Sequence, residues 1–418
     1  MTIMHDSSNP FPQNVDQVFT QCKIATMADG HYGIVENAAL AVSGKKIAWI
    51  GPMDALPETP GNIRVTDCQN FWILPGFVDC HTHLIWAGSR AKEFEMRLAG
   101  ASYADIAKAG GGIFSTVRAT RAADEDMLFD LAAGRMAHLL TQGITTVEIK
   151  SGYGLDLDTE LKMLSVAGRL QKTCPQQVKA TFLGAHALPP EFSGRADDYI
   201  TEVTEVMLPR VKDQGIATAV DVFCENIAFS RKQTRQVFEK ALEAGFAIKL
   251  HAEQLSDSDG TALAAQLGAL SCDHLEYLSL KGVRKMAAHD TVAVLLPGAF
   301  YYLRETRVPP VDSLLQMNVP MAVSTDLNPG SSPVHSMLLV LNMACLLFGL
   351  TCEQALAGAT IHAAKALGLA DRKGSLAPGK DADLVIWDVD TPADLCYPFG
   401  ITPVKMVVTG GKTAYTRM

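Results

Sequence analysis

Two histidines separated by one residue, His81 and His83, are the residues of this chain best placed to do chemistry. They directly follow an apolar run, residues 71–79, which predicts a buried strand with the pair at its end. Residues i and i+2 of a strand point to the same side, so both imidazoles can reach one ion. Neutral imidazole nitrogens are ligands for zinc and related divalent metals. We therefore expect a metal ion at this strand end.

The elements that position this pair follow from the hydrophobic pattern between about residues 71 and 330. Apolar strand-like runs alternate there with amphipathic helical segments, which is typical of parallel α/β folds. Eight strands are predicted, at residues 71–79, 144–149, 178–184, 219–223, 246–250, 270–274, 291–296 and 319–325. Helices are predicted at 125–142, 158–171, 200–214, 231–244 and 311–317. This alternation predicts a (β/α)₈ barrel, a TIM-like barrel, and a doubly wound open sheet is disfavoured because no GxGxxG follows a strand.

The two ends of the chain have a different pattern. Residues 36–51, 381–390 and 404–416 alternate in hydrophobicity around glycine-containing turns, which predicts β-hairpins. We expect one small β-sandwich built from both termini, residues 1–70 and 374–418, beside a catalytic barrel domain over 71–373. The apolar helical segments at 336–349 and 352–368 are expected to pack against the barrel.

Polar side chains stand at nearly every predicted strand end. They are Lys150 and Tyr153 after the second strand, His186 after the third, Glu225 after the fourth, His251 after the fifth, His274 after the sixth and Asp326 after the eighth. The carboxyl ends of barrel strands meet at one face, so these groups should gather there. A single histidine is as often a packing residue as a functional one, but five of the chain's eleven histidines fall at such positions.

The set His81, His83, His251 and Asp326 offers three imidazoles and one carboxylate. It leaves a coordination position for water, as a catalytic metal site requires. A metal ion there activates water as a nucleophile and polarises a substrate carbonyl. We expect Asp326 to be a ligand and to accept the proton of the water, and His274 to stabilise an oxyanion or move a proton.

Several other residues have a functional and a plain structural interpretation. Arg90 is suited to a substrate carboxylate, or it forms an ordinary surface salt bridge. Tyr153 lies in a glycine-flanked turn, where a ligand would explain an aromatic side chain. The glycine-rich stretch 109–121 lacks the GK[ST] sequence that binds phosphate, so we expect a mobile loop over the site. Residues 324–333 offer backbone and hydroxyl donors, or are a plain turn.

Composition excludes several classes of protein. With a net charge of −9 and no basic stripe, the chain is not expected to bind nucleic acid. No run of 18 apolar residues predicts a membrane span, and residues 1–14 lack the apolar stretch of a signal peptide. Nine cysteines without paired short spacing indicate reduced thiols. We expect a cytoplasmic protein that acts on a small molecule.

The chain also resembles the amidohydrolase superfamily in its HxH pair, its histidines after strands five and six, its aspartate after strand eight and its terminal hairpins. Within that superfamily it resembles the imidazolonepropionases, enzymes of histidine degradation. The resemblance covers essentially the whole chain. It is carried by CHTHLIWAGSRAKEFEMRLAGASYADIAKAGGGIFSTVRATR, EIKSGYGLD, LGAHALPPE, HAEQLS, DHLEY and STDLNPGSSP.

The resemblance implies hydrolysis of the ring amide of 4-imidazolone-5-propanoate to N-formimidoyl-L-glutamate. It implies one zinc or iron ion per chain on the four ligands named above, with His274 assisting Asp326 in proton transfer, and it implies a homodimer. It further implies a set of substrate contacts, with Arg90 on the propionate. These contacts are Arg90, Tyr153, His186, Gln254, Asn328, Gly330 and Ser331.

One position departs from the pattern of related deaminases, which carry glutamate three residues after the strand-five histidine. Here Gln254 occupies that position, and Glu253 beside it is expected to face away. Glutamine donates and accepts hydrogen bonds but carries no proton. We therefore expect Gln254 to orient the substrate, and the proton transfers to fall to Asp326 and His274. The glutamine also counts against a deaminase.

Three alternatives remain open at this point. A hydantoinase-like or dihydroorotase-like enzyme would use two metals bridged by a modified lysine after strand four, where this chain has Glu225, and Lys150 follows strand two. A non-catalytic barrel scaffold would have lost its ligands, which are all present here. A sugar-phosphate barrel would use the loop around 327–332 and leave the histidines without a purpose.

Overall fold

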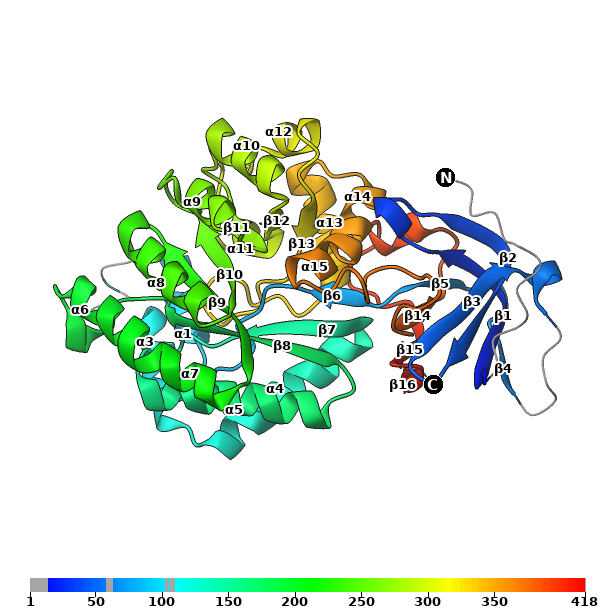
Figure 1. Ribbon diagram of the computed structural model, residues 1–418, viewed down its shortest axis with the longest axis horizontal. Coiled ribbons are helices and arrows are strands. Elements are labelled where there is room, and N and C mark those ends of the chain that lie inside the picture. Colours follow the sequence, from blue (N-terminus) through cyan, green and yellow to red (C-terminus); the bar gives the residue numbers. More distant parts are fainter. Residues whose placement is uncertain (1–13, 58–62, 102–104, 106–109, 418) are drawn as a thin grey trace.

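The computed structural model describes residues 14–57, 63–101, 105 and 110–417, which form two sheets and the helices around one of them (Figure 1). The larger sheet has eight parallel strands that neighbour one another in chain order from β6 to β13. This is the predicted barrel. Its strands are β6 (Phe77–Asp79), β7 (Ile144–Lys150), β8 (Gln177–Ala185), β9 (Ala217–Cys224), β10 (Ala247–Ala252), β11 (Ser271–His274), β12 (Val292–Leu295) and β13 (Met321–Val323).

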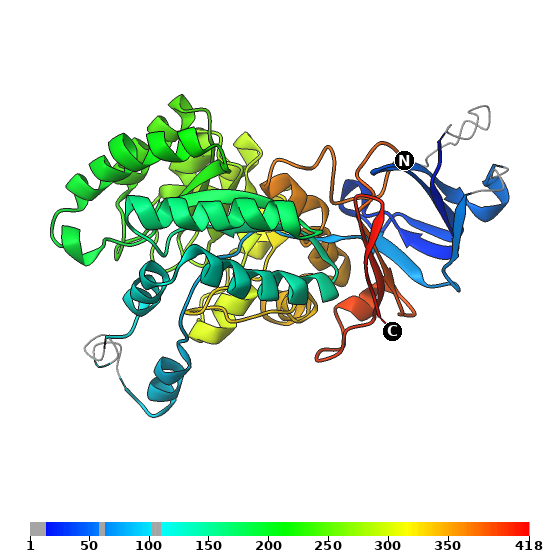
Figure 2. The ribbon, with the colours of Figure 1, turned by 90° about the horizontal axis from the view of Figure 1, so that it is seen from below.

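Helices separate the strands and cover the outside of the barrel (Figures 1 and 2). Five of them begin at a side-chain cap: Asp124, Asp156, Ser230, Ser336 and Thr351 each accept a backbone N–H of the first turn. The helices are α1 (Ala91–Leu98), α3 (Ile113–Ala122), α4 (Glu125–Thr141), α5 (Leu157–Thr173), α6 (Ala196–Thr201), α7 (Leu208–Gln214), α8 (Arg231–Glu243), α9 (Gly260–Gln266), α10 (Leu280–His289), α11 (Pro297–Leu303), α12 (Val311–Gln316), α13 (Met337–Phe348), α14 (Cys352–Gly358) and α15 (Ile361–Ala366). No helix among the described residues is both long and apolar enough to cross a membrane.

The first and last barrel strands meet through side chains and not through a regular ladder. The Asp79 carboxylate accepts hydrogen bonds from the Ser324 hydroxyl, and from the Thr325 amide and hydroxyl at 3.0 and 2.7 Å. One parallel bridge, Thr82 with Leu327, follows. This seam fixes the segment after β6 beside the segment after β13, which is where the predicted metal ligands lie.

The smaller sheet combines both ends of the chain, as predicted (Figure 2). It runs in the order β16-β15-β14-β5-β1-β2-β3, with β4 also on β1, and encloses a separate apolar core that includes Phe19, Leu40 and Ile386. Gly44, with φ +56°, makes the tight turn between β2 and β3. The strands are β1 (Gln17–Ala25), β2 (Ile34–Ser43), β3 (Lys46–Pro52), β4 (Arg64–Asp67), β5 (Trp72–Pro75), β14 (Leu384–Trp387), β15 (Val404–Thr409) and β16 (Lys412–Thr416).

The strand predicted over residues 71–79 is two strands that belong to different sheets. β5 pairs with β1 and β14 in the small sheet, whereas β6 pairs with β7 in the barrel. Gly76 separates them, and a β-carbon there would clash with the side chain of Thr145. The chain thus passes from one sheet to the other at Gly76. The division into domains at residue 70 stays a prediction, and we propose Gly76 as the boundary.

Three predicted segments differ from the structure for local reasons. The helix expected at 200–214 contains a π-helical stretch, Glu202–Met207, just before Pro209, which has no N–H for an α-helical bond. The helix expected at 352–368 breaks after Gly358, where a β-carbon would touch Val323. The stretch expected as a mobile loop is helical from Ile113 onwards, and residues 106–109 lie outside the described part.

Candidate metal centre

The predicted ligands come together at the carboxyl end of the barrel. His81 and His83 follow β6, His251 is the last residue but one of β10, His274 ends β11 and Asp326 follows β13. All five side chains are buried. His274 and Asp326 have positive φ angles of 82° and 51°, which non-glycine residues adopt only when their surroundings hold them there. The strands and the seam therefore fix the groups before any ligand binds.

The ring nitrogens and the carboxylate converge on one point. His81 Nε2 and His83 Nε2 lie 3.5 and 3.6 Å from the same Asp326 oxygen, Oδ1. His251 Nε2 lies 3.3 Å from His83 Nε2. The ligand atoms form two overlapping groups within 4.8 Å, His81 with His83 and Asp326, and His81 with His251 and His274. His251 and Asp326 do not share a group, and His81 belongs to both. One ion bound by all four predicted ligands therefore stays a prediction.

The opposite ring nitrogens of two of these histidines are held by carboxylates. His81 Nδ1 lies 2.5 Å from Asp273 Oδ2, and His251 Nδ1 lies 3.1 Å from Asp221. A carboxylate accepts the N–H of Nδ1, which leaves the lone pair of Nε2 directed into the centre. This carboxylate–histidine arrangement is the one that protein metal sites use to orient their imidazole ligands.

The residues present fit a divalent metal. Nε2 of His81 is buried and has no hydrogen-bond partner among the described residues. Three imidazole nitrogens and one carboxylate oxygen are a donor set for zinc or iron. Burial lowers the pKa values of His81 and His83 well below the usual range, so both rings are neutral, as ligands must be.

Beneath the centre, the barrel interior holds two buried lysines among three carboxylates. Lys150 Nζ lies 2.7 Å from Asp221 and 2.9 Å from Glu148, and Lys249 Nζ lies 2.9 Å from Glu148. Burial alone would lower the pKa of Lys150, but Asp221, Glu148 and Asp273 raise it. Lys150 is thus an ion-paired cation below the metal ligands, with no geometry for bridging two metals.

Sequence reasoning missed most of this network. Asp221, Asp273, Glu148 and Lys249 each interrupt an apolar strand, and a charged residue inside a parallel barrel strand has to find a buried partner. Glu148 with Lys150, and Lys249 with His251, also share a strand face at i, i+2 spacing. These two signals together were sufficient to predict a charged layer beneath the histidines.

Glu225, which follows β9, is also engaged in structural hydrogen bonds. Its carboxylate accepts the N–H groups of Leu255 and Ser256 and the Ser256 hydroxyl, the last at 2.6 Å. It therefore shapes the loop after β10.

Glu253 faces away from the centre, as predicted, because its carboxylate accepts hydrogen bonds from Gly260 and Thr261.

Two aromatic side chains line one side of the metal centre. The His186 ring stacks on His83 at 5.1 Å between centroids, and Tyr153 lies 5.9 Å from His83 and 5.6 Å from His186. His186 Nδ1 lies 2.9 Å from the Gly152 carbonyl oxygen, which orients the ring. Burial lowers the pKa of His186 to about 4, so this ring is a neutral hydrogen-bonding group.

Arg90 lies against the loop after β13. Its Nε and Nη2 donate to Glu93 at 2.9 and 2.7 Å, and its Nη1 lies where a β-carbon of residue 330 would be. Glycine at position 330 therefore makes room for the guanidinium. Arg90 thus forms a salt bridge, as one of the two interpretations predicted, and also reaches the loop after β13. Its contact with a substrate carboxylate stays a prediction.

That loop is organised by Asn328. Its Oδ1 accepts the N–H groups of Gly330 and Ser331 at 2.8 and 2.7 Å, and its Nδ2 donates to the Asp326 carbonyl at 2.7 Å. The hydrogen-bonding groups of the Asn328 side chain are thus largely occupied by partners within the loop. Gln254 is buried near the mouth, with no side-chain hydrogen bond in the described part of the chain. Substrate contact by these residues stays a prediction.

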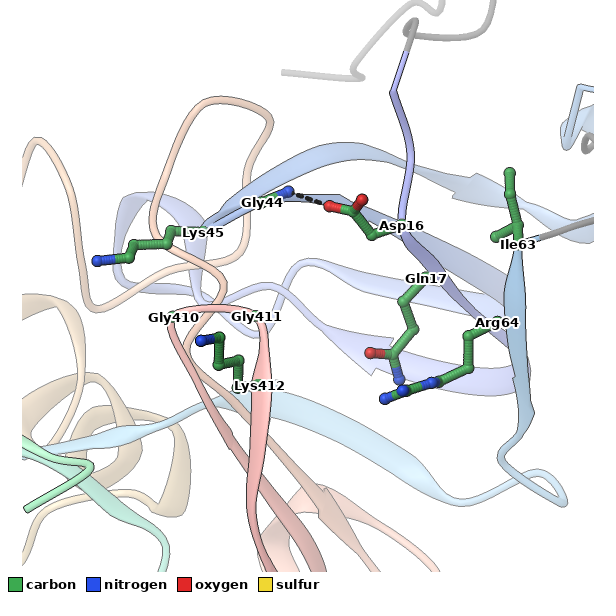
Figure 3. Close-up of a pocket in the computed structure, with 9 residues that line it drawn as sticks. All are labelled: Asp16, Gln17, Gly44, Lys45, Ile63, Arg64, Gly410, Gly411 and Lys412. Carbon is green, nitrogen blue, oxygen red and sulfur yellow. Dashed lines mark hydrogen bonds between the residues drawn. The ribbon is translucent and has the colours of Figure 1, made fainter.

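A separate hollow lies on the small sheet, away from the histidines (Figure 3). Its charged lining consists of Asp16, Lys45, Arg64 and Lys412. The Asp16 carboxylate is occupied by the Gly44 N–H. This hollow contains no imidazole, so we place the chemistry at the barrel mouth.

Comparison with known proteins agrees with this geometry. The profile of the amidohydrolase family matches residues 72–414. Imidazolonepropionase of Shewanella putrefaciens is 55% identical over 404 residues, which cover 96% of this chain and 99% of that protein. Imidazolonepropionase of Cupriavidus necator is 55% identical over 412 residues, with 99% and 98% coverage.

Solved structures share the fold at low identity. An adenosine deaminase of Xanthomonas campestris with bound zinc superposes with a TM-score of 0.72 at 20% identity, over 96% of this chain and 93% of that one. Guanine deaminase of E. coli gives 0.72 at 18% identity, over 96% and 99%. The family match and the close relatives go further than the fold: this chain belongs to the amidohydrolase family and, within it, to the imidazolonepropionases.

Proposed function

We propose that this chain hydrolyses the ring amide of 4-imidazolone-5-propanoate to N-formimidoyl-L-glutamate, a step of histidine degradation. The observation that carries this proposal is the 55% identity to imidazolonepropionases over nearly the whole chain. Two overlapping buried groups support it, His81 with His83 and Asp326, and His81 with His251 and His274, because amide hydrolysis needs an activated water and a polarised carbonyl.

We further propose that these four residues hold one zinc or iron ion per chain. When bound, such an ion makes a water molecule acidic near neutral pH and polarises the ring carbonyl. Asp326 would accept the proton of that water. Since its carboxylate already touches the imidazoles of His81 and His83, it stays fixed while it does so.

The ring C–N bond breaks when the tetrahedral carbon collapses and the departing ring nitrogen receives a proton. Asp326 holds that proton, and His274 belongs to the same centre, with its ring centroid 5.8 Å from that of His81. Nδ1 of His274 has no hydrogen-bond partner among the described residues, so it is free for a substrate. Gln254 orients the ring but transfers no proton.

On the substrate side, we propose that Arg90 binds the propionate and that Tyr153 and His186 contact the ring. Asn328, Gly330 and Ser331 complete the pocket through the loop after β13. Arg90 donates to Glu93 through Nε and Nη2, so its Nη1 is left as a donor for a substrate carboxylate.

Arg90→Ala should raise KM for the imidazolone substrate by roughly 10–100-fold, the worth of a hydrogen bond to a charged group. Steady-state kinetics together with a thermal melt measure this effect. Arg169→Ala is the matched control, because Arg169 forms salt bridges with Glu125 and Asp126 away from the barrel mouth. An unchanged KM with a lowered Tm would make Arg90 a purely structural residue.

The activity itself is tested by supplying the purified protein with 4-imidazolone-5-propanoate, hydantoin and dihydroorotate, with metal counted on the same sample. We expect turnover of the first substrate alone and one ion per chain. Two ions with turnover of hydantoin or dihydroorotate would instead support a two-metal cyclic amidase.

We propose that the enzyme is a homodimer and works in the cytoplasm. All nine cysteines are free thiols, which fits a reducing compartment. Four large apolar side chains are exposed near α13: Leu346 at 74%, Tyr397 at 80%, Phe399 at 67% and Ile401 at 59%. Hydrogen bonds from Asn342 to the carbonyls of Cys396 and Tyr397 hold these two segments side by side, so the four residues offer an interface.

Leu346→Glu combined with Phe399→Glu should therefore convert the dimer to a monomer, which sedimentation equilibrium measures directly. Leu98→Glu, at an exposed apolar position of α1, serves as the control and should leave the dimer intact. A wild-type protein that sediments as a monomer would contradict the proposal.

A further inference from the structure

Three cysteines, Cys345, Cys352 and Cys396, bring their sulfur atoms within 4.8 Å of one another. Cys345 lies in α13, Cys352 is the first residue of α14, and Cys396 follows η5 (Pro392–Leu395), which connects β14 to β15 of the small sheet. The cluster thus joins helices of the barrel to the small sheet. None of the three is among the residues of the metal centre described above.

The backbone that presents these thiols is well fixed. Gly349, with φ +73°, ends α13, and the Thr351 side chain caps α14 two residues later. The turn between the helices therefore brings Cys345 and Cys352 to one side. Asn342 of α13 donates to the Cys396 carbonyl at 2.8 Å and holds the third cysteine against the same helix.

The cluster is enclosed but open to solvent on one side. Cys396 is 2% exposed, whereas Cys345 and Cys352 are half-buried. Of the nine cysteines, Cys174 is the only other one that is not buried. A small ion can therefore reach these thiols, and few others compete for it.

The Cys396 thiol donates to the Cys352 carbonyl oxygen at 3.8 Å, and the three sulfurs lie close to one another. Hydrogen bonds from Cys396 and Cys352 lower the pKa of Cys345 to about 7, against the opposing effect of burial. The hydrogen bond with Cys345 and burial raise the pKa of Cys396, and burial raises that of Cys352, so these two thiols lose their protons only when an ion binds. Thiolates are the soft ligands that zinc and its heavier relatives prefer.

We propose that Cys345, Cys352 and Cys396 bind one thiophilic divalent ion of the zinc group, separate from the catalytic ion, with solvent in the fourth position. Three convergent sulfurs suit coordination, because a disulfide would join only two of them and would need an oxidant. Binding releases the thiol protons to solvent. The ion would link α13 and α14 to the loop between β14 and β15, and so tie the small sheet to the barrel.

The test is a titration of the purified, reduced holoenzyme with Cd²⁺, followed by the ultraviolet charge-transfer band that a cadmium–thiolate bond gives. We expect the band to saturate at one equivalent per chain and the Tm to rise. Cadmium that enters the histidine–aspartate centre gives no such band, so Asp326→Asn should show the same titration.

In Cys345→Ser the affinity reported by the band should fall by at least about a hundredfold, since even partners outside the coordination sphere contribute up to that much. This variant should keep wild-type hydrolase activity. Cys174→Ser is the matched control and should retain the band. No band in the wild type or a band unchanged in Cys345→Ser would overturn the proposal. So would a thiol count lowered by two through a disulfide in protein isolated without reductant.

Discussion

Replacing Asp326 by asparagine is expected to abolish turnover while the fold survives. The carboxylate is the only group that we place both on the metal and on the proton of the attacking water, and its removal should lower kcat by at least about 10³-fold. The hydrogen bond from Asn328 is to the backbone carbonyl of residue 326, so the loop after β13 should keep its conformation. Steady-state kinetics and a thermal melt measure the two effects.

Metal content, counted on the same sample, separates loss of the proton acceptor from loss of the ion. Activity should stay absent even when the variant carries one equivalent of metal. Asp388→Asn, at an exposed carboxylate paired with Lys405 on the small sheet, is the control and should retain full activity. A wild-type rate in Asp326→Asn would remove Asp326 from the mechanism.

Lys150→Met is expected to be the most damaging substitution outside the metal ligands. It leaves Asp221 and Glu148 buried with one cation fewer, and removing one partner of a buried ion pair costs about 3–5 kcal/mol. Because Asp221 also holds His251, the affinity for the catalytic ion should fall as well. Chemical denaturation and metal titration measure these two losses.

Lys405→Met is the matched control for this variant. It removes the same kind of pair from the surface, where Lys405 and Asp388 are both about half exposed, and it should cost about 0–1 kcal/mol. Equal stability losses in the two variants would contradict a special role for the buried layer.

The barrel was predictable because its strands bury both faces and so appear as short apolar runs between helical patterns. The centre was predictable because parallel strands deliver their terminal residues to one face, and His81 and His83 share a strand side. The boundary at Gly76 was not predictable from the sequence. β5 and β6 are both apolar and buried, and nothing in the composition of 71–79 indicates that the chain changes sheet there.

Other features depend on contacts between segments far apart in sequence. The break after Gly358 arises from its close approach to β13. Cys345, Cys352 and Cys396 meet because the loop after η5 packs on α13 and α14, with hydrogen bonds from Asn342 and from the Cys396 thiol. Spacing along the chain carries no sign of either. By contrast, the charged residues inside apolar strands did carry a signal, and sequence reasoning did not use it.

The passage of the chain through Gly76 links the integrity of the small sheet to metal binding in the barrel. Only β6 lies between the terminal sheet and His81, and the Gly76 amide itself donates to the Asp383 carbonyl just ahead of β14. A truncation that strips away the last three strands would leave β5 without its β14 neighbour and loosen the anchor of the histidine pair. Loss of these C-terminal strands would thus lower the affinity of the distant histidine site for its metal ion.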